Sequence, residues 1–139
     1  MTEIELKQRT KQLALRVMKL VGALPQNSVG RPIGNQLIRS GPSIGANYRA
    51  ACRGRSKPEF IAKLGIVVEE ADESVYWLER IIEGELLAKR LFEPLLNEAN
   101  EQTAIMTASH RSAERAVQNP KSQNTKIKKH KTNNNKNKK

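Results

Sequence analysis

The sequence has few of the residues from which most enzyme and metal sites are built. It contains one cysteine, Cys52, and two histidines, His110 and His130, which stand twenty residues apart. One thiol cannot form an intrachain disulfide, and a structural zinc site needs four Cys or His ligands. No nucleophile–base motif and no Glu-x-x-His pair of a bundle metal site occurs. We therefore predict a protein that is not an enzyme, needs no cofactor or metal, and resides in a reducing, cytoplasmic setting.

Long apolar runs and aromatic residues are also scarce. No apolar stretch approaches the 18 or more residues that a membrane-spanning helix requires. The first residues, MTEIELK, carry two acids where a secretory signal is basic and then apolar. We therefore expect no membrane contact. Aromatic residues make up 4% of the chain, so the core must be aliphatic and few side chains can stack on nucleic-acid bases.

Charge is abundant and unevenly distributed. Residues 1–57 carry eleven Lys and Arg against two acids, and residues 58–117 carry six against twelve. Residues 118–139 carry eight Lys and no acid, and the whole chain has a net charge of +11. The body is therefore predicted to have a basic half and an acidic half, followed by a polycationic tail. Such basic surfaces favour nucleic acid or other polyanions.

The strongest helix signal runs from Ser56 to Glu83. Ser56 and Glu59 have the spacing of a capping box, and Pro58 fits the first turn. Apolar residues then recur at spacings of three, four and seven and lie within about 120° on a helical wheel. These residues are Phe60, Ile61, Leu64, Val67, Val68, Ala71, Val75, Leu78 and Ile82. A helix about 40 Å long with one wholly apolar face must be covered by the rest of the chain.

A smaller group of residues on this helix lies away from the main stripe. It comprises Ile66, Trp77 and Ile81, with Glu70 among them. These residues either pack on a neighbouring helix of the same chain or form an oligomer interface, since Trp is enriched where protein surfaces meet.

The second helix, from about Ile33 to Arg53, is the hardest to predict because it contains Pro42. An interior proline costs about 3 kcal/mol in an isolated helix, and propensity alone would break this one at Ser40. The helical spacing of its apolar residues instead favours a kinked but continuous helix.

Two more helices complete the predicted fold. One runs from about Glu3 to Leu24, and the last from about Ala88 to Val117, with His110 facing solvent. Four amphipathic helices with short connections predict an all-α fold, an antiparallel up-down four-helix bundle over residues 1–117. Residues 118–139 are rich in Lys and Asn and have one aliphatic residue, Ile127. This composition is typical of a disordered tail.

The basic residues are the best functional candidates. Arg39, Arg49 and Arg53 lie on the second helix opposite its apolar face, and Arg55 and Lys57 follow in the turn. Guanidinium groups suit phosphate oxygens, but the same arginines could instead pair with acids of the third helix. The tail is either a second polyanion contact or a solubilising extension. Its candidate binding residues are Lys126, Lys128, Lys129 and Lys131.

Two runs of sequence resemble a known bacterial family. RSGPSIGAN (39–47) and RGRSKPEFIAKLGIVVEEADESVYWLE (53–79) are similar to small four-helix-bundle proteins encoded in intervening sequences of the 23S ribosomal RNA gene. LLNEANEQTAIMTAS (95–109) fits their fourth helix, and the resemblance covers about residues 13–113. It implies a bundle that assembles into a ring, a homopentamer in the family. A more distantly similar bundle, the accessory protein of diversity-generating retroelements, partners a reverse transcriptase and nucleic acid.

Two hypotheses about function follow from these features. The first is a non-enzymatic, oligomeric bundle that contacts the backbone of RNA or DNA through basic residues of the second helix and the tail. The alternative is a protein-interaction scaffold, such as an accessory subunit that recruits a reverse transcriptase or another nucleic-acid-handling protein.

Overall fold

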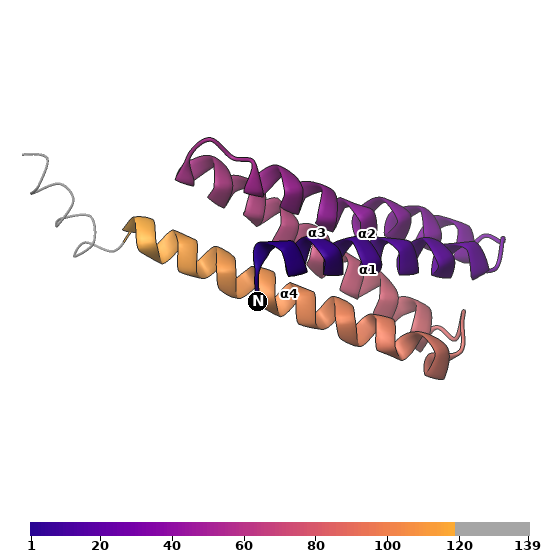
Figure 1. Cartoon of the computed structure of the whole chain (residues 1–139). Coiled ribbons are helices and arrows are strands. Elements are labelled where there is room, and N and C mark those ends of the chain that lie inside the picture. Colours follow the sequence, from indigo (N-terminus) through magenta and orange to yellow (C-terminus); the bar gives the residue numbers. More distant parts are fainter. Residues whose placement is uncertain (119–139) are drawn as a thin grey trace, which may run out of the picture.

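The computed structural model describes residues 1–118, which form four α-helices (Figure 1). They are α1 (Glu3–Ala23), α2 (Gly30–Cys52), α3 (Lys57–Glu83) and α4 (Lys89–Gln118). Each helix contacts the next, and a smaller contact between α1 and α4 closes the bundle. The predicted all-α, up-down bundle is confirmed. The predicted tail, with its candidate lysines, lies outside the described residues.

Side-chain caps fix the starts of α1 and α3. Thr2 and Glu5 form a full capping box: the Thr2 hydroxyl accepts from the Glu5 N–H (3.1 Å), and the Glu5 carboxylate accepts from the Thr2 N–H (3.3 Å). The Ser56 hydroxyl accepts from the Glu59 N–H (3.2 Å), as predicted. The Glu59 carboxylate, however, accepts from the N–H of Arg55 instead of Ser56. The reciprocal half of the predicted box is therefore displaced by one residue.

α2 continues through Pro42 without a break. The apolar spacing therefore predicted this helix better than local propensity did. Leu37 and Ile44, which flank the proline, are both fully buried. Full burial of each such side chain stabilises the fold by about 1.5–3 kcal/mol, which offsets the hydrogen bond that Pro42 cannot donate.

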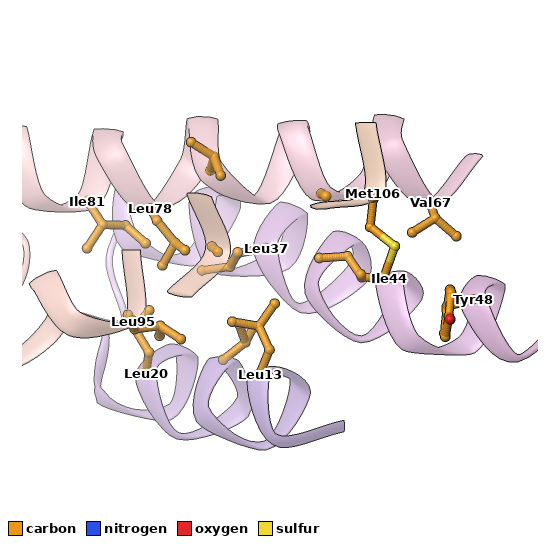
Figure 2. Close-up of a cluster of buried hydrophobic side chains, with 14 of the residues drawn as sticks. Leu13, Leu20, Leu37, Ile44, Tyr48, Val67, Leu78, Ile81, Leu95 and Met106 are labelled. Atoms are coloured by element: carbon orange, nitrogen blue, oxygen red, sulfur yellow. The ribbon is translucent and has the colours of Figure 1, made fainter. Parts of the chain in front are cut away.

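The core is aliphatic, as the composition predicted (Figure 2). Ile81 belongs to this core, where it shares one cluster with Leu78 and Leu95 and has no exposed surface. The prediction that Ile81 is part of an oligomer interface is therefore wrong, because its side chain is covered within its own chain. Other fully buried members include Leu13, Leu20, Leu37, Ile44, Leu64 and Met106.

Small residues bring α2 close to α1. A β-carbon at Gly41 would lie 2.8 Å from Cγ1 of Val17, and one at Gly45 would lie 3.1 Å from Oγ1 of Thr10. Both distances are shorter than ordinary van der Waals contacts, so a larger residue at either position would force its neighbour on α1 to move. The close approach places the charged residues on the outer edges of α1 and α2 beside one another.

Candidate nucleic-acid interface

Beyond the first turn of α1, the first two helices carry no negative charge. No Asp or Glu occurs between Glu5 and Glu59, whereas eleven Lys and Arg lie between them. Any acid that neutralises these residues must therefore come from the start of α1 or from residues 59–118. The basic half predicted from the charge distribution thus corresponds to the layer formed by α1 and α2.

Arg39 of α2 forms ion pairs with two acids of α3. Its guanidinium group lies 2.5 Å from Oε1 of Glu73 and 3.5 Å from Oε1 of Glu70, both on α3. The hydrogen bond to Glu73 raises the pKa of Arg39 above its ordinary value. For this arginine, the interpretation as an ion pair with the third helix is confirmed.

The other predicted cations remain exposed. Arg49, Arg53, Arg55 and Lys57 form no ion pair with any residue of the described chain. Arg49 lies in the last turn of α2, Arg53 and Arg55 lie in the connection, and Lys57 begins α3. All four residues are therefore at the same end of the bundle. Their charges are available to a polyanion.

A basic groove between α1 and α2 adds residues that the sequence analysis missed. It has a volume of about 450 Å³, with Lys7 and Lys11 on its α1 side and Arg49 on its α2 side. The rest of its lining is short or uncharged: Gln8, Thr10, Ala14, Pro42, Gly45 and Ala46. We call this hollow the α1–α2 groove.

The sequence did contain a signal for this groove. α1 and α2 are antiparallel around a loop near Asn27 and Ser28, so facing residues have numbers that sum to about 56. That rule pairs Lys7 with Arg49 and Lys11 with Gly45. Lys7 and Lys11 lie far from Arg49 in the sequence, so no local cluster of basic residues marks them.

Cys52 and His110 are both partly buried. Cys52 borders a hollow of about 390 Å³ with Arg55 and Lys57 on its rim, but burial raises the pKa of its thiol and so disfavours the reactive thiolate. His110, predicted to face solvent, instead packs over Gly65 of α3, where a β-carbon would lie 3.2 Å from its Nε2. Across residues 1–118, no group of three or more His, Cys, Asp or Glu is placed to hold a metal ion.

The outer face of α3 carries an aromatic patch, which we define as Ile66, Tyr76, Trp77 and Arg80. Ile66 is 37% exposed and Tyr76 49% exposed. The rings of Tyr76 and Trp77 meet edge to face with centroids 5.0 Å apart, and the Arg80 guanidinium lies 4.6 Å above the Tyr76 ring. Ile66 and Trp77 were predicted from the sequence, whereas Tyr76 was not, although it adjoins Trp77 in the chain.

Glu70 has a different environment from that of the aromatic patch. Its side chain is 17% exposed and pairs with Arg39 within the chain. Its Oε2 is buried without a hydrogen-bond partner among the described residues. Glu70 therefore belongs mainly to the contact between α2 and α3.

Residues 2–108 match the family described as 23S rRNA-intervening sequence proteins. The chain belongs to this family. A crystal structure of a protein of unknown function, from the S23 ribosomal protein family of Bacteroides thetaiotaomicron, is 32% identical to it. The two superimpose with a TM-score of 0.71 over 80% of this chain and 99% of that one. None of the curated proteins matches the chain.

Membership in the 23S rRNA-intervening sequence family confirms the resemblance drawn from residues 39–79. The matched region covers most of the four helices and ends at residue 108, within α4. No helix among residues 1–118 is both long and apolar enough to cross a membrane.

Proposed function

We propose that this protein is a non-enzymatic, self-assembling bundle that binds the backbone of RNA or DNA. The observation that carries the proposal is the group of uncompensated cations at the end of α2: Arg49, Arg53, Arg55 and Lys57 are exposed and have no carboxylate partner among the described residues. Lys and Arg contacts to phosphate supply most of the sequence-independent affinity of nucleic-acid-binding proteins. The tail adds eight lysines, among them Lys126, Lys128, Lys129 and Lys131.

The proposed assembly uses the aromatic patch of α3. Trp, Tyr and Arg are the side chains that most often dominate the binding energy of protein interfaces, and here Tyr76, Trp77 and Arg80 are already held against one another. We place a contact between copies there, in a ring that the family resemblance puts at five chains. Several basic surfaces in one particle raise avidity without any new contact.

Fluorescence anisotropy tests the proposed binding activity. The full-length protein and a chain ending at Gln118 are titrated with labelled duplex RNA, duplex DNA and single strands at several salt concentrations. Four phosphate contacts per chain predict that affinity falls roughly 150-fold between 50 and 200 mM salt. If the truncated chain still binds but its affinity depends less steeply on salt concentration, both the bundle and the tail contact the nucleic acid. If neither chain binds any of these ligands in a salt-dependent way, the proposal is wrong.

The second candidate function is a protein-interaction scaffold, and the aromatic patch favours it. The exposed acid beside the patch, Glu69, repels nucleic acid but accepts a basic partner protein. A reverse transcriptase or another nucleic-acid-handling protein fits this chemistry. Absence of nucleic-acid binding, together with a molar mass that does not depend on Ile66 or Tyr76, selects this candidate over the first.

A further inference from the structure

We propose that the α1–α2 groove holds the backbone of a double-stranded nucleic acid, with Lys7, Lys11 and Arg49 contacting its phosphates. This inference rests on the proposed function. It adds to that function the α1 side of the binding site and the form of nucleic acid that the site accepts.

The geometry of the groove suits a phosphodiester ridge. Lys7 and Lys11 are four residues apart on α1, so they are separated by about 6 Å along the helix axis. Arg49 faces them from α2, and the floor between them is made of short residues, including Gly45 and Ala46. A ridge of phosphates can therefore enter between the two lysines of α1 and Arg49 of α2.

Two further cations of α1 lie outside the groove. Arg16 and Lys19 line a neighbouring hollow of about 580 Å³ on the same helix. At about 100° per residue, Lys19 and Arg16 lie roughly 120° and 180° around the helix from Lys7, so they face away from the groove. The cations of the groove are therefore Lys7, Lys11 and Arg49.

The placement of aromatic side chains favours a duplex. Proteins that bind single strands gain much of their affinity from bases stacked on aromatic rings. No aromatic side chain lines the α1–α2 groove. Tyr76 is exposed and Trp77 partly buried on α3, among acids, and Tyr48 of α2 is buried. The groove can therefore hold phosphates but offers no surface on which unpaired bases could stack.

One carboxylate lies beside the site. Oε2 of Glu3 is 3.5 Å from Nζ of Lys7, in an i, i+4 pair with both side chains well exposed. Exposed pairs of this kind contribute little to stability. A phosphate can therefore replace Glu3 as the partner of Lys7, while Lys11 and Arg49 have no partner to give up among the described residues.

The test compares two double variants of the full-length protein. Lys11→Gln with Arg49→Gln removes two cations from the groove, and Lys89→Gln with Arg90→Gln removes two exposed cations from the start of α4 as a charge-matched control. At about 0.1 M salt, loss of two phosphate contacts predicts a roughly 60-fold weaker Kd for duplex and a salt slope smaller by about 2. The expected change for single strands, and for the control with either ligand, is less than about 3-fold. The tail is the same in every protein, so its contribution cancels.

The possible outcomes separate this inference from the proposed function. If the groove variant weakens single-strand binding as much as duplex binding, or leaves duplex binding intact, the inference is overturned while nucleic-acid binding itself stands. If the groove variant changes the molar mass of the particle but leaves duplex binding unchanged, the groove is a contact with a second copy of the chain, and the inference is again overturned. If the wild-type protein binds no nucleic acid, the proposed function fails first. Parallel titrations with RNA and DNA duplexes identify which duplex is preferred, and thermal unfolding confirms that each variant is folded.

Discussion

Arg9 of α1 and Glu98 of α4 join the first helix to the last through a two-pronged ion pair. Nη2 of Arg9 lies 2.6 Å from Oε1 of Glu98, and Nε donates to Oε2 at 2.9 Å. The buried Gln102 donates to the same carboxylate (2.8 Å) and to the backbone carbonyl of Arg9 (3.0 Å). Because α1 and α4 touch less than the other neighbouring helices, this polar cluster is a large part of the contact that closes the bundle.

Replacing Glu98 with Gln should lower the free energy of unfolding by about 2 kcal/mol at pH 7, because a partly buried guanidinium loses its charged partner. Urea unfolding followed by circular dichroism measures the loss. Glu101→Gln is the control, since Glu101 also approaches Arg9 (3.1 Å) but is 63% exposed. Equal losses in the two variants would contradict the special role of Glu98.

The same pair predicts a dependence of stability on pH. The hydrogen bond from Arg9 lowers the pKa of Glu98 below its ordinary value of 4.5. The unfolded chain therefore binds this proton more readily, so the contribution is complete above pH 4.5 and is lost as pH falls through the folded-state pKa. The wild type should lose this component in acid, whereas Glu98→Gln should not. Unfolding free energies of both proteins between pH 3 and 7 test the difference.

Two glycine-to-alanine substitutions should have opposite effects. Gly41→Ala places a methyl group 2.8 Å from Cγ1 of the buried Val17, and overpacking of this kind costs about 1–3 kcal/mol. Gly22→Ala has no atom within 4 Å of the new methyl group, so it should stabilise α1 by about 0.5–1 kcal/mol through helix propensity. Thermal unfolding of both variants measures the two signs, and stabilisation by Gly41→Ala would contradict the close approach of the helices.

Two arginines of α2 should differ in their importance for nucleic-acid binding. Arg49→Gln removes an uncompensated cation and should weaken binding roughly 8-fold at about 0.1 M salt. Arg39→Gln removes a cation already held by Glu70 and Glu73, so its Kd should change by less than about 2-fold. Anisotropy titrations compare the two variants, and equal losses would indicate that only net charge matters.

Assembly should depend on Ile66 but not on Ile38. Both residues are 37% exposed. Ile66→Ala removes part of the aromatic patch. Ile38→Ala is the control, because it truncates an equally exposed residue of α2. Adding Tyr76→Ala to Ile66→Ala removes a second exposed side chain of the patch. Light scattering should show a smaller particle for this pair, with helicity unchanged by circular dichroism. A molar mass that is the same for all variants would exclude the patch as the contact.

The order and approximate bounds of the helices followed from the sequence, because amphipathic spacing and Ser56 as a cap are local properties. Pro42 shows where local reasoning fails: the packing that offsets its missing hydrogen bond comes from helices distant in sequence. Ile81 shows a second limit. A helical wheel places it between the apolar stripe and Trp77, and only the packed neighbours decide that it is buried.

The candidate site was only partly predictable. The exposed arginines after Tyr48 form a local cluster, so composition was enough to find them. Lys7 and Arg49 are far apart in sequence and meet only through the antiparallel pairing of α1 with α2. Whether an arginine is free or neutralised, as the contrast between Arg49 and Arg39 shows, depends on which residues of α3 face it.

The absence of acids from residues 6–58 has a consequence for synthesis of the protein. The ribosome makes α1 and α2 first, so the emerging segment is a polycation before any residue of α3 exists. Arg39 cannot be neutralised until Glu70 and Glu73 have been added, and Arg9 must wait for Glu98. The nascent chain therefore carries a net charge of +9 when residue 57 has been added, and the acids of residues 58–117 lower this charge to +3 before the lysines of the tail are made.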